Sequence, residues 1–172
     1  KVVPGMRAFG IRGINVTIPH KVTIMPYLQE IHPVAGLIGA VNTVANVDGH
    51  LVGYNTDGVG FLKSLEEEGG RTPEGQHITI LGAGGSARAI GFQLALSHPK
   101  AIIIANRNEA NAKTLANDIE TSLDCNVQGI GFESLDNHLP NTDILVNTTP
   151  LGMYPHVTEI PPVNLQLLKQ SA

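Results

Sequence analysis

Lys21 and Asp57 are the residues whose types could carry proton transfer in this chain. Lys21 closes the segment 15–21, and Asp57 directly follows Asn55 and Thr56. A lysine ammonium can protonate a carbonyl oxygen when hydride reaches the carbonyl carbon, and the same amine can remove that proton in reverse. A neighbouring carboxylate would orient the lysine and stabilise its charge. The two residues are 36 positions apart (57 − 21 = 36), so the sequence pattern alone favours a surface lysine and a helix cap over a proton-transfer pair.

A glycine-rich segment at residues 82–88 could bind phosphates. It reads Gly-Ala-Gly-Gly-Ser-Ala-Arg and matches the G-x-G-x-x-A form of the dinucleotide-binding pattern. Gly82 would allow the tight turn, Gly84 would let the backbone approach a pyrophosphate, and Ala87 would keep the next helix close to the sheet. Free N–H groups at the start of that helix would bind the phosphates. A ligand-free glycine turn is the alternative, and the strand and helix predicted on either side favour the nucleotide.

The end of the next predicted strand bears on which nucleotide this loop would bind. Asn106 lies 24 residues after Gly82 (106 − 82 = 24), where a carboxylate would bind the ribose 2′-hydroxyl of NAD. No carboxylate stands there, and Arg107 follows. An arginine can hold a 2′-phosphate through charge-assisted hydrogen bonds. The sequence therefore favours NADP; NAD stays open because Glu109 is close by, and Arg107 could instead be a solvated surface residue.

A regular alternation of strands and helices must position the phosphate loop. The predicted elements are strands at 78–81, 101–105, 126–130 and 144–147, helices at 86–97 and 109–123, and a helical turn at 135–139. Strands that alternate with helices indicate a parallel sheet with right-handed crossovers. We therefore predict an α/β fold in which residues 58–172 form a doubly wound, Rossmann-type nucleotide domain.

Residues 1–57 are expected to form a smaller α/β substrate domain that carries Lys21 and Asp57. The predicted elements are a strand at 14–18, a helix from 19 to 30, and short strands at 40–46 and 51–54 around a turn at 48–49. Helical spacing of apolar residues resumes after Asp57, which could cap that helix. The cleft between the two domains would then hold the reacting groups.

Composition and charge exclude several classes of protein. The 172 residues are 42% hydrophobic and 15% charged, which suits a packed core. The net charge of −4 and the lack of a basic tract argue against nucleic-acid binding. No apolar run approaches the roughly 18 residues of a membrane span. The single cysteine, Cys125, fits a cytoplasmic compartment, and the seven histidines form no cluster that predicts a metal site.

Six motifs together resemble the shikimate dehydrogenase family, in the order in which that family carries them. They are NVTIPHK at 15–21, GAVNT at 39–43, GYNTDG at 53–58, GAGGSAR at 82–88, NR at 106–107 and NTTPLGM at 147–153. The resemblance covers essentially the whole chain. It implies the reversible, NADPH-dependent reduction of 3-dehydroshikimate to shikimate in aromatic amino-acid (chorismate) biosynthesis, with a small-molecule substrate and a monomer or homodimer.

The resemblance also implies roles for individual residues. Lys21 corresponds to the catalytic lysine, and Asp57 to its partner carboxylate, which also binds a substrate hydroxyl. Asn15, Thr17 and Asn42 correspond to residues that contact the hydroxyls and carboxylate of the substrate. The implied cofactor-binding residues are Gly82, Ala83, Gly84, Gly85, Ser86, Asn106, Arg107, Thr148 and Met153.

Some features of the family have no counterpart in these residues. The family carries a serine pair nearer its N-terminus and a glutamine nearer its C-terminus, so we expect pieces of both domains to be missing here and the substrate site to be incomplete. A second arginine of some NADP-preferring members corresponds to Asn111. Two alternatives stay open: a quinate or dual quinate/shikimate dehydrogenase that uses NAD or NADP, and a non-catalytic regulatory domain. Lys21 and Asp57 together disfavour the second.

Overall fold

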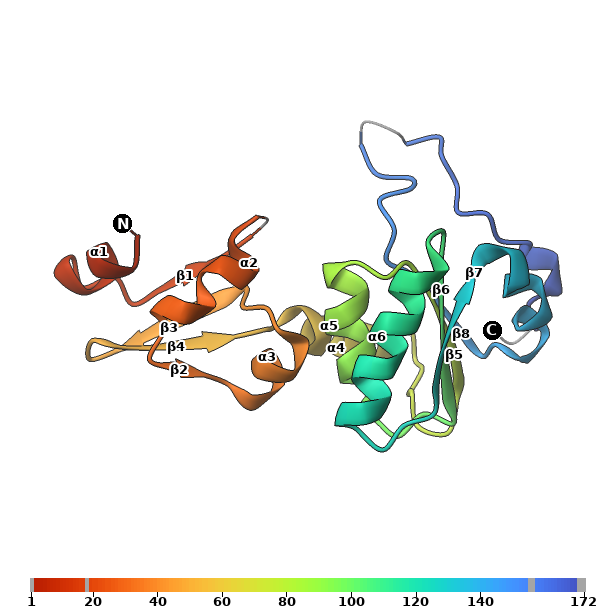
Figure 1. Cartoon of the computed structure of the whole chain (residues 1–172), viewed down its shortest axis with the longest axis horizontal. Helices are drawn as coiled ribbons and strands as arrows, with labels where there is room; N and C mark the ends of the chain where they lie inside the picture. The colour runs from red at the N-terminus through yellow and green to blue at the C-terminus, as the bar shows by residue number, and fades with distance from the viewer. Residues whose placement is uncertain (1, 18, 155–156, 170–172) are drawn as a thin grey trace.

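Two sheets lie at opposite ends of an elongated molecule, with helices between them (Figure 1). The structure is a computed structural model that describes residues 2–17, 19–154 and 157–169. The helices between the sheets are α3 (Pro33–Ile38), α4 (Asp57–Glu67) and α5 (Gly85–Ala95). These three helices connect the part of the chain that holds Lys21 to the part that holds the glycine-rich loop.

The first sheet is mixed and has the strand order β1-β3-β4-β2. Its strands are β1 (Gly13–Asn15), β2 (Glu30–Ile31), β3 (Thr43–Val47) and β4 (His50–Tyr54). β3 is antiparallel to β1 and β4, whereas β2 runs parallel to β4. The turn between β3 and β4 has positive φ at Asp48 (52°) and Gly49 (86°), as a two-residue hairpin turn of type I′ requires.

The predicted helix over residues 19–30 is wrong. α2 (His20–Thr23) is a single turn, and a 3-10 turn, η1 (Met25–Tyr27), follows it before β2 begins. Pro26 explains the break, because its ring lacks an N–H donor and disfavours the α conformation of the preceding residue.

Other boundaries in this part also differ from the predictions. β1 is shorter than the predicted strand at 14–18, and Ile18 lies outside the described residues. α1 (Val2–Ala8) and α3 have no counterpart among the predicted elements. α3 starts with a proline at its first position, where the missing N–H costs no hydrogen bond. It ends before Gly39, whose φ of 73° is the left-handed conformation in which glycine commonly terminates a helix. Its six residues are too few to show a helical period in the sequence.

The second sheet is parallel throughout and has the order β7-β6-β5-β8. Its strands are β5 (His77–Leu81), β6 (Ala101–Asn106), β7 (Val127–Gly131) and β8 (Ile144–Asn147). Numbered along the chain this order is 3-2-1-4, as in the first four strands of a Rossmann fold. α5 and α6 (Glu109–Ser122) connect the first three strands. The predicted α/β class with a Rossmann-type sheet is confirmed.

Both faces of the second sheet are covered. Ile80 and Ile104 are fully buried in the core cluster that contains the apolar residues of α5 and α6. Leu81 and Ala105, one position later, belong to a separate cluster on the opposite face, because side chains alternate along a strand. That face is covered by 3-10 segments: η2 (Phe132–Asn137), η3 (Leu139–Asn141) and η4 (Leu165–Leu167).

α4 carries the chain from the first sheet toward the second. It starts directly after β4 and packs closely against α5. The closest approach is at Gly58, where a Cβ atom would lie 2.6 Å from the carbonyl oxygen of Ala89. Across the described ranges of the chain, no helix has the length and apolar character needed to cross a membrane.

Candidate active site

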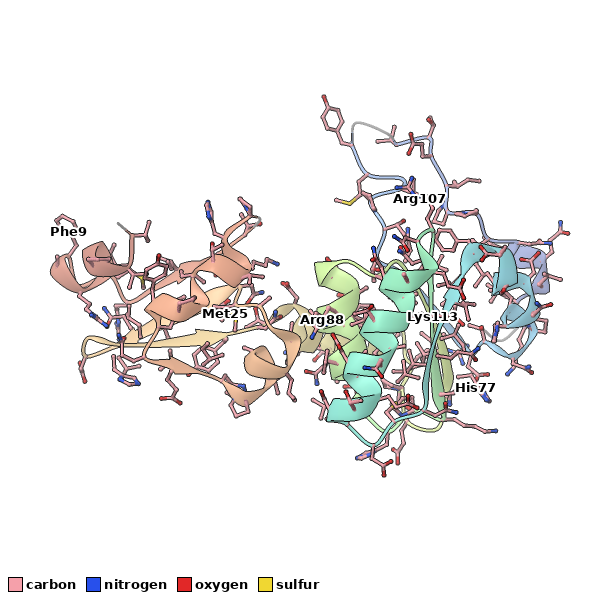
Figure 2. The ribbon with its side chains drawn as sticks, viewed as in Figure 1. Phe9, Met25, His77, Arg88, Arg107 and Lys113 are labelled. Atoms are coloured by element: carbon pink, nitrogen blue, oxygen red, sulfur yellow. The ribbon has the colours of Figure 1, made fainter. Side chains whose placement is uncertain are left out.

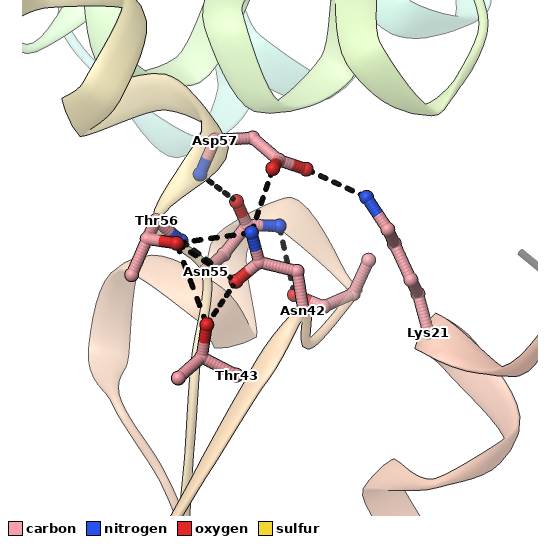
Figure 3. Close-up of polar contacts among 7 residues, drawn as sticks. Lys21, Asn42, Thr43, Asn55, Thr56 and Asp57 are labelled. Atoms are coloured by element: carbon pink, nitrogen blue, oxygen red, sulfur yellow. Dashed lines mark hydrogen bonds and ion pairs between the residues drawn. The ribbon is translucent and has the colours of Figure 1, made fainter. Parts of the chain in front are cut away.

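Lys21, Asn42 and Asp57 form one hydrogen-bonded cluster (Figure 3). The Lys21 Nζ atom donates to Asp57 Oδ2 over 2.7 Å. The Asn42 Nδ2 atom donates to Asp57 Oδ1 over 2.6 Å. Both carboxylate oxygens of Asp57 therefore have a donor, and the fold unites three residues that are far apart in the sequence. We call this group the Lys–Asn–Asp cluster.

Three elements position the Lys–Asn–Asp cluster. Lys21 lies on α2, and its carbonyl oxygen accepts a hydrogen bond from the Val41 N–H at 2.9 Å. Asn42 directly precedes β3, and its own N–H donates to the Tyr54 oxygen at 2.9 Å. Asp57 is the first residue of α4. Backbone hydrogen bonds thus fix the segments that carry Lys21 and Asn42.

Asn55 and Thr56 hold the turn that carries Asp57. Asn55 is only 7% exposed; its Nδ2 donates to the Ala40 oxygen and its Oδ1 accepts from the Asp57 N–H, both at 3.1 Å. The Thr56 N–H donates to Asn42 Oδ1 at 2.9 Å. Neither residue has a predicted role from the sequence. The available signal was their type, since Asn and Thr before a helix commonly bond to nearby backbone groups.

The suggestion that Asp57 caps α4 is wrong. Thr56 occupies the N-cap position, its side chain makes no capping hydrogen bond, and the Asp57 N–H donates to the Asn55 side chain instead. Asp57 lies within the first turn, where a negative charge is favourable, and its carboxylate is directed at Lys21 and Asn42 (Figure 3). The side chain is therefore engaged by the Lys–Asn–Asp cluster rather than by the helix backbone.

The Lys–Asn–Asp cluster is accessible to a ligand. The side chains of Lys21 and Asp57 are 27% and 36% exposed. An ammonium group has three N–H donors. Among the residues that the structure describes, Lys21 uses one donor, toward Asp57, so two donors can serve a bound molecule. Such a site can hold a hydroxyl or carbonyl oxygen against the ammonium and exchange a proton with it.

Asn15 and Thr17 flank Val16, whose N–H donates to the Asn42 oxygen at 2.7 Å, and Asn15 pairs with Thr43 across β1 and β3. Asn15 and Thr17 are both exposed, and both line a pocket of about 480 Å³ whose wall includes residues of α1 and α2. Most of the side chains around this pocket are apolar, and neither Lys21 nor Asp57 lines it. In the described part of the chain, no hydrogen bond joins the side chains of Asn15 or Thr17 to the Lys–Asn–Asp cluster.

The glycine-rich loop connects β5 to α5 at the C-terminal edge of the second sheet. Gly82 has a φ of 106°, and a Cβ atom there would lie 2.7 Å from Thr148 Oγ1, so both conformation and space require glycine. Gly84 and Gly85 differ, because a Cβ atom on either would meet no atom within 4 Å. Ser86 is exposed next to them. Open space beside the N-terminal N–H groups of α5 fits a pyrophosphate.

The loop is pinned between the ends of two strands. The Gly82 N–H donates to the Ala105 oxygen at the end of β6 over 2.8 Å. Thr148, directly after β8, donates to the Leu81 oxygen twice, from Oγ1 at 2.6 Å and from its N–H at 2.9 Å. Ala83 is half-buried against the core. These contacts hold the loop at one edge of the sheet before any nucleotide binds.

Asn106 and Arg107 stand at the end of β6, next to the glycine-rich loop (Figure 2). The Asn106 Nδ2 atom donates to the Asn108 oxygen at 3.0 Å, and the Asn108 side chain caps α6 by accepting from the Ala110 N–H. Arg107 is exposed, and among the described residues its guanidinium has no hydrogen bond or ion pair. A free guanidinium at this place fits a phosphate group.

Met153 lies on the segment that leaves the second sheet after β8 (Figure 1). Its side chain is 64% exposed, and its N–H closes a turn by donating to the Pro150 oxygen at 3.0 Å. Within the described ranges, no group of three or more His, Cys, Asp and Glu side chains could hold a metal ion. The chemistry available at this edge is therefore that of amides, a serine, a threonine and an arginine.

Two groups with shifted pKa values, Asp143 and Cys125, lie away from the Lys–Asn–Asp cluster and from the glycine-rich loop. The Lys169 ammonium, which donates to the Asp143 carboxylate at 2.6 Å, and the His77 N–H lower the pKa of Asp143 to about 2. His77 begins β5 and Asp143 directly precedes β8, at the edge of the sheet opposite the glycine-rich loop, whereas Lys169 follows η4. Burial raises the pKa of the Cys125 thiol, and two nearby carboxylates add to this shift.

Family models match both parts of the chain. One, described as a shikimate dehydrogenase substrate binding domain, matches residues 1–44, and another, described as shikimate / quinate 5-dehydrogenase, matches residues 65–153. The chain is 45% identical over 170 residues to the shikimate dehydrogenase (NADP(+)) of Desulforamulus reducens. That alignment covers 98% of this chain and 58% of the relative, so the chain spans somewhat more than half of its length.

Solved structures share the arrangement. The crystal structure of shikimate 5-dehydrogenase from Listeria monocytogenes, in complex with shikimate and NAD, matches with a TM-score of 0.90 and 40% identity, covering 98% of this chain and 60% of that chain. A ligand-free 5-ketofructose reductase from Gluconobacter matches with a TM-score of 0.87, also at 40% identity and with the same coverage. Because these two enzymes are named for different substrates, overall similarity leaves the substrate to be argued from the site.

Proposed function

Since the chain belongs to the shikimate/quinate 5-dehydrogenase family, we propose that its protein is an NADP-dependent shikimate dehydrogenase. The family membership confirms the resemblance drawn from the sequence motifs. The proposed reaction is the reversible reduction of 3-dehydroshikimate to shikimate. The observation that carries the proposal is the hydrogen-bonded Lys–Asn–Asp cluster, accessible at one end and joined through α4 and α5 to an open phosphate loop.

The two sheets belong to two domains with different proposed roles. We assign residues 1–57 to the substrate-binding and catalytic domain and residues 58–172 to the NADP-binding domain. The position of Asp57 at the start of α4 supports this boundary, because the helix that leaves the first sheet begins there. Opposed domains suit this reaction, since closure can exclude water and align the reacting groups.

Lys21 is the proposed general acid and base. In the reduction its ammonium donates a proton to the ketone oxygen, which becomes the new hydroxyl; in the oxidation the neutral amine takes the proton back from that hydroxyl. Asp57 keeps the ammonium in place through its Oδ2 atom and accepts a hydrogen bond from a substrate hydroxyl. Asn42 fixes the rotamer of Asp57 through Oδ1 and contacts the substrate.

Asn15 and Thr17 are the proposed contacts for the remaining hydroxyls and the carboxylate of the substrate. Their exposure supports this role. The N–H of Val16, which lies between them, donates to the Asn42 oxygen at 2.7 Å, so the segment that carries both residues is next to a member of the Lys–Asn–Asp cluster.

NADPH, when bound, supplies the hydride. We propose that backbone N–H groups of Gly82, Ala83, Gly84, Gly85 and Ser86 hold its pyrophosphate. Arg107 would pair with the 2′-phosphate and Asn106 would contact the adenosine side, whereas Thr148 and Met153 lie on the segment proposed to pass the ribose and nicotinamide. The open space at Gly84 supports a dinucleotide, and the guanidinium of Arg107, which has no partner among the described residues, supports NADP. NAD is the second candidate, because the Listeria relative was solved with it.

The proposed setting follows from the reaction. Reduction of 3-dehydroshikimate belongs to aromatic amino-acid (chorismate) biosynthesis, and the single cysteine suits a cytoplasmic enzyme. The partner is a small hydroxy acid rather than a nucleic acid or a membrane, and a monomer or a homodimer is proposed. Quinate is the second candidate substrate, because the description of the matching family names it.

A panel of substrates and cofactors tests the proposed function. Initial rates of the complete protein would be measured with shikimate and quinate, each with NADP⁺ and NAD⁺. We expect the highest kcat/KM for shikimate with NADP⁺. A higher value for quinate with NAD⁺ would replace the proposal with a quinate dehydrogenase. Tight NADP⁺ binding without oxidation of either acid would indicate a non-catalytic regulatory protein.

A further inference from the structure

The side chain of Arg88 joins three helices that belong to different parts of the fold. Arg88 lies on α5, and its Nε atom donates to the Ile38 oxygen at the end of α3. Its NH2 group makes a longer contact of 3.5 Å to the Leu37 oxygen, and its NH1 group donates to Asp118 of α6 at 2.6 Å. The guanidinium also stacks 5.1 Å from the ring centre of Phe92. Figure 2 shows it at the junction between the two sheets.

The end of α3 leads directly into the Lys–Asn–Asp cluster. After Ile38 the chain turns at Gly39, which has a φ of 73°. The Ala40 oxygen then accepts from Asn55, the Val41 N–H donates to the Lys21 oxygen, and the next residue is Asn42 itself. A displacement of the end of α3 would therefore move the segment that positions all three members of the cluster.

The other end of the connection is the phosphate loop. α5 begins at Gly85, so Arg88 lies on its first turn, beside the N–H groups proposed to bind pyrophosphate. The neighbouring residue, Ala89, forms the close contact with Gly58, which follows Asp57. Two adjacent residues of α5 thus touch the two segments, α3 and the start of α4, that carry the Lys–Asn–Asp cluster.

We propose that Arg88 is a positioning residue that sets the separation between the Lys–Asn–Asp cluster and the nicotinamide nucleotide. This inference rests on the proposed function, because it concerns the alignment of proton donor and hydride donor on one substrate. Alignment matters steeply: a misplacement of about 1 Å can cost about a hundredfold in rate. Arg88 touches neither substrate nor cofactor in this account and acts through α3.

Arginine suits this position better than lysine. The last carbonyl groups of a helix lack partners within the helix, and a cation there is favourable. A guanidinium has five N–H donors in a fixed planar fork, so it can bond to the end of α3 and to Asp118 at once. A lysine ammonium is a point charge on a flexible stem and cannot hold both at fixed geometry.

The first test separates positioning from binding in the complete protein. Arg88→Lys keeps the charge, and Arg88→Met removes all hydrogen-bond donors. Arg7→Met is the matched control, because Arg7 Nε also donates to a carbonyl oxygen, that of Gly49 at 3.0 Å, but this bond lies within residues 1–57 and does not join the two sheets. We expect kcat to fall about tenfold to a hundredfold in both Arg88 variants. The KM values for shikimate and NADP⁺ should change less than about twofold. The control should keep wild-type kcat.

Two results of this kinetic test would overturn the proposal. Unchanged kcat in a folded Arg88→Lys and Arg88→Met would show that the contacts with α3 do not affect alignment. A rise in the KM for NADP⁺ at unchanged kcat would make Arg88 a phosphate ligand instead. Wild-type inactivity toward every acid tested would contradict the proposed function, and the next measurement does not depend on activity.

The second test measures the distance between the first sheet and α6 directly. Spin labels would be attached through Val47→Cys on the first sheet and Asn117→Cys on α6, with Cys125→Ala to remove the native thiol; Val47 and Asn117 are both exposed. We expect a narrow distance distribution with Arg88 and a broader or shifted one with Arg88→Lys or Arg88→Met, but not with Arg7→Met. Identical distributions in all variants would overturn the proposal whatever reaction the protein catalyses.

Discussion

The Nζ atom of Lys21 lies 2.7 Å from Oδ2 of Asp57, although 36 positions separate the two residues in the chain. The other carboxylate oxygen accepts from Asn42. Asp57 therefore accepts a hydrogen bond at each carboxylate oxygen. The Lys21 ammonium and the Asn42 NH₂ group can only donate, so neither could accept a hydrogen bond from residue 57. The charge and the two-sided acceptor geometry of Asp57 can be tested separately from its shape.

Asp57→Asn tests this geometry. The amide keeps the shape but presents one NH₂ group, which must face either the Lys21 ammonium or the Asn42 amide donor. We expect kcat to fall by about tenfold or more and the KM for shikimate to rise, because the lysine loses its orientation and the substrate loses an acceptor. The dissociation constant for NADPH, measured by fluorescence, should not change. Wild-type kcat and KM would reduce Asp57 to a residue of the helix start.

Two glycines of the phosphate loop should respond differently to alanine. In Gly82→Ala the new methyl group meets Thr148 at a strained φ, so the free energy of unfolding should fall by about 1–3 kcal/mol. In Gly84→Ala the methyl group enters open space, so stability should be unchanged. Affinity for NADP⁺ should nevertheless fall in Gly84→Ala, because the methyl group occupies the space proposed for the pyrophosphate. Urea unfolding and nucleotide titration measure the two quantities.

Gly84→Ala tests where the pyrophosphate of the cofactor binds. Wild-type NADP⁺ affinity in Gly84→Ala would mean that the pyrophosphate does not approach this backbone. An equal loss of stability in both variants would mean that the open space beside Gly84 is closed in solution.

Arg107→Ala tests cofactor selection. Removing a charged hydrogen-bond donor from the 2′-phosphate should weaken NADP⁺ binding by about 1.5–3 kcal/mol. NAD⁺ binding should hardly change, since NAD⁺ has no 2′-phosphate. Titration of both nucleotides into wild type and variant measures the difference. Equal losses for NAD⁺ and NADP⁺ would assign Arg107 to structure rather than to selectivity.

Asp143 gives a prediction about acid stability. Its pKa is lowered from 3.8 to about 2, chiefly by the Lys169 ammonium. A lowered pKa in the folded state stabilises the protein above the unfolded-state pKa, and this contribution is lost as pH falls through the folded-state pKa. The difference in free energy of unfolding between wild type and Asp143→Asn should therefore be constant from pH 7 to about pH 5 and shrink toward pH 2.

Urea unfolding at several pH values measures this difference, with Asp136→Asn, an exposed aspartate, as the control. The control should change stability little at any pH. A difference for Asp143→Asn that stays constant down to pH 2 would show that Lys169 does not hold the carboxylate ionised in solution.

The second sheet could be predicted from the sequence because each of its elements is long and regular. Four apolar strand segments and two helical periods lie between clear breaks, so β5 to β8 with α5 and α6 appear close to their predicted bounds. The first sheet could not be predicted as well. There Pro26 ends a helix after one turn, and α3 has only six residues, so local patterns carry too little information.

The candidate site was predictable as residue types but not as contacts. Lys21 and Asp57 have the chemistry of a proton-transfer pair, yet only the tertiary structure shows that they touch. The contact between Arg88 and the end of α3 had no sequence signal, since it depends on the packing of three helices. Asp57 as a helix cap was a reasonable local prediction that a long-range ion pair overrides.

The proposed role of Lys21 in proton transfer is tested most directly by the steady-state rate of shikimate oxidation by Lys21→Ala in the complete protein, with both substrates saturating. Lys21 is the only member of the Lys–Asn–Asp cluster proposed to exchange a proton with the substrate. We predict that kcat falls by about a hundredfold or more, whereas the dissociation constant for NADP⁺ and the thermal midpoint stay close to wild type. Near wild-type kcat in the folded variant would contradict the account, because another group would then have to donate and accept the proton.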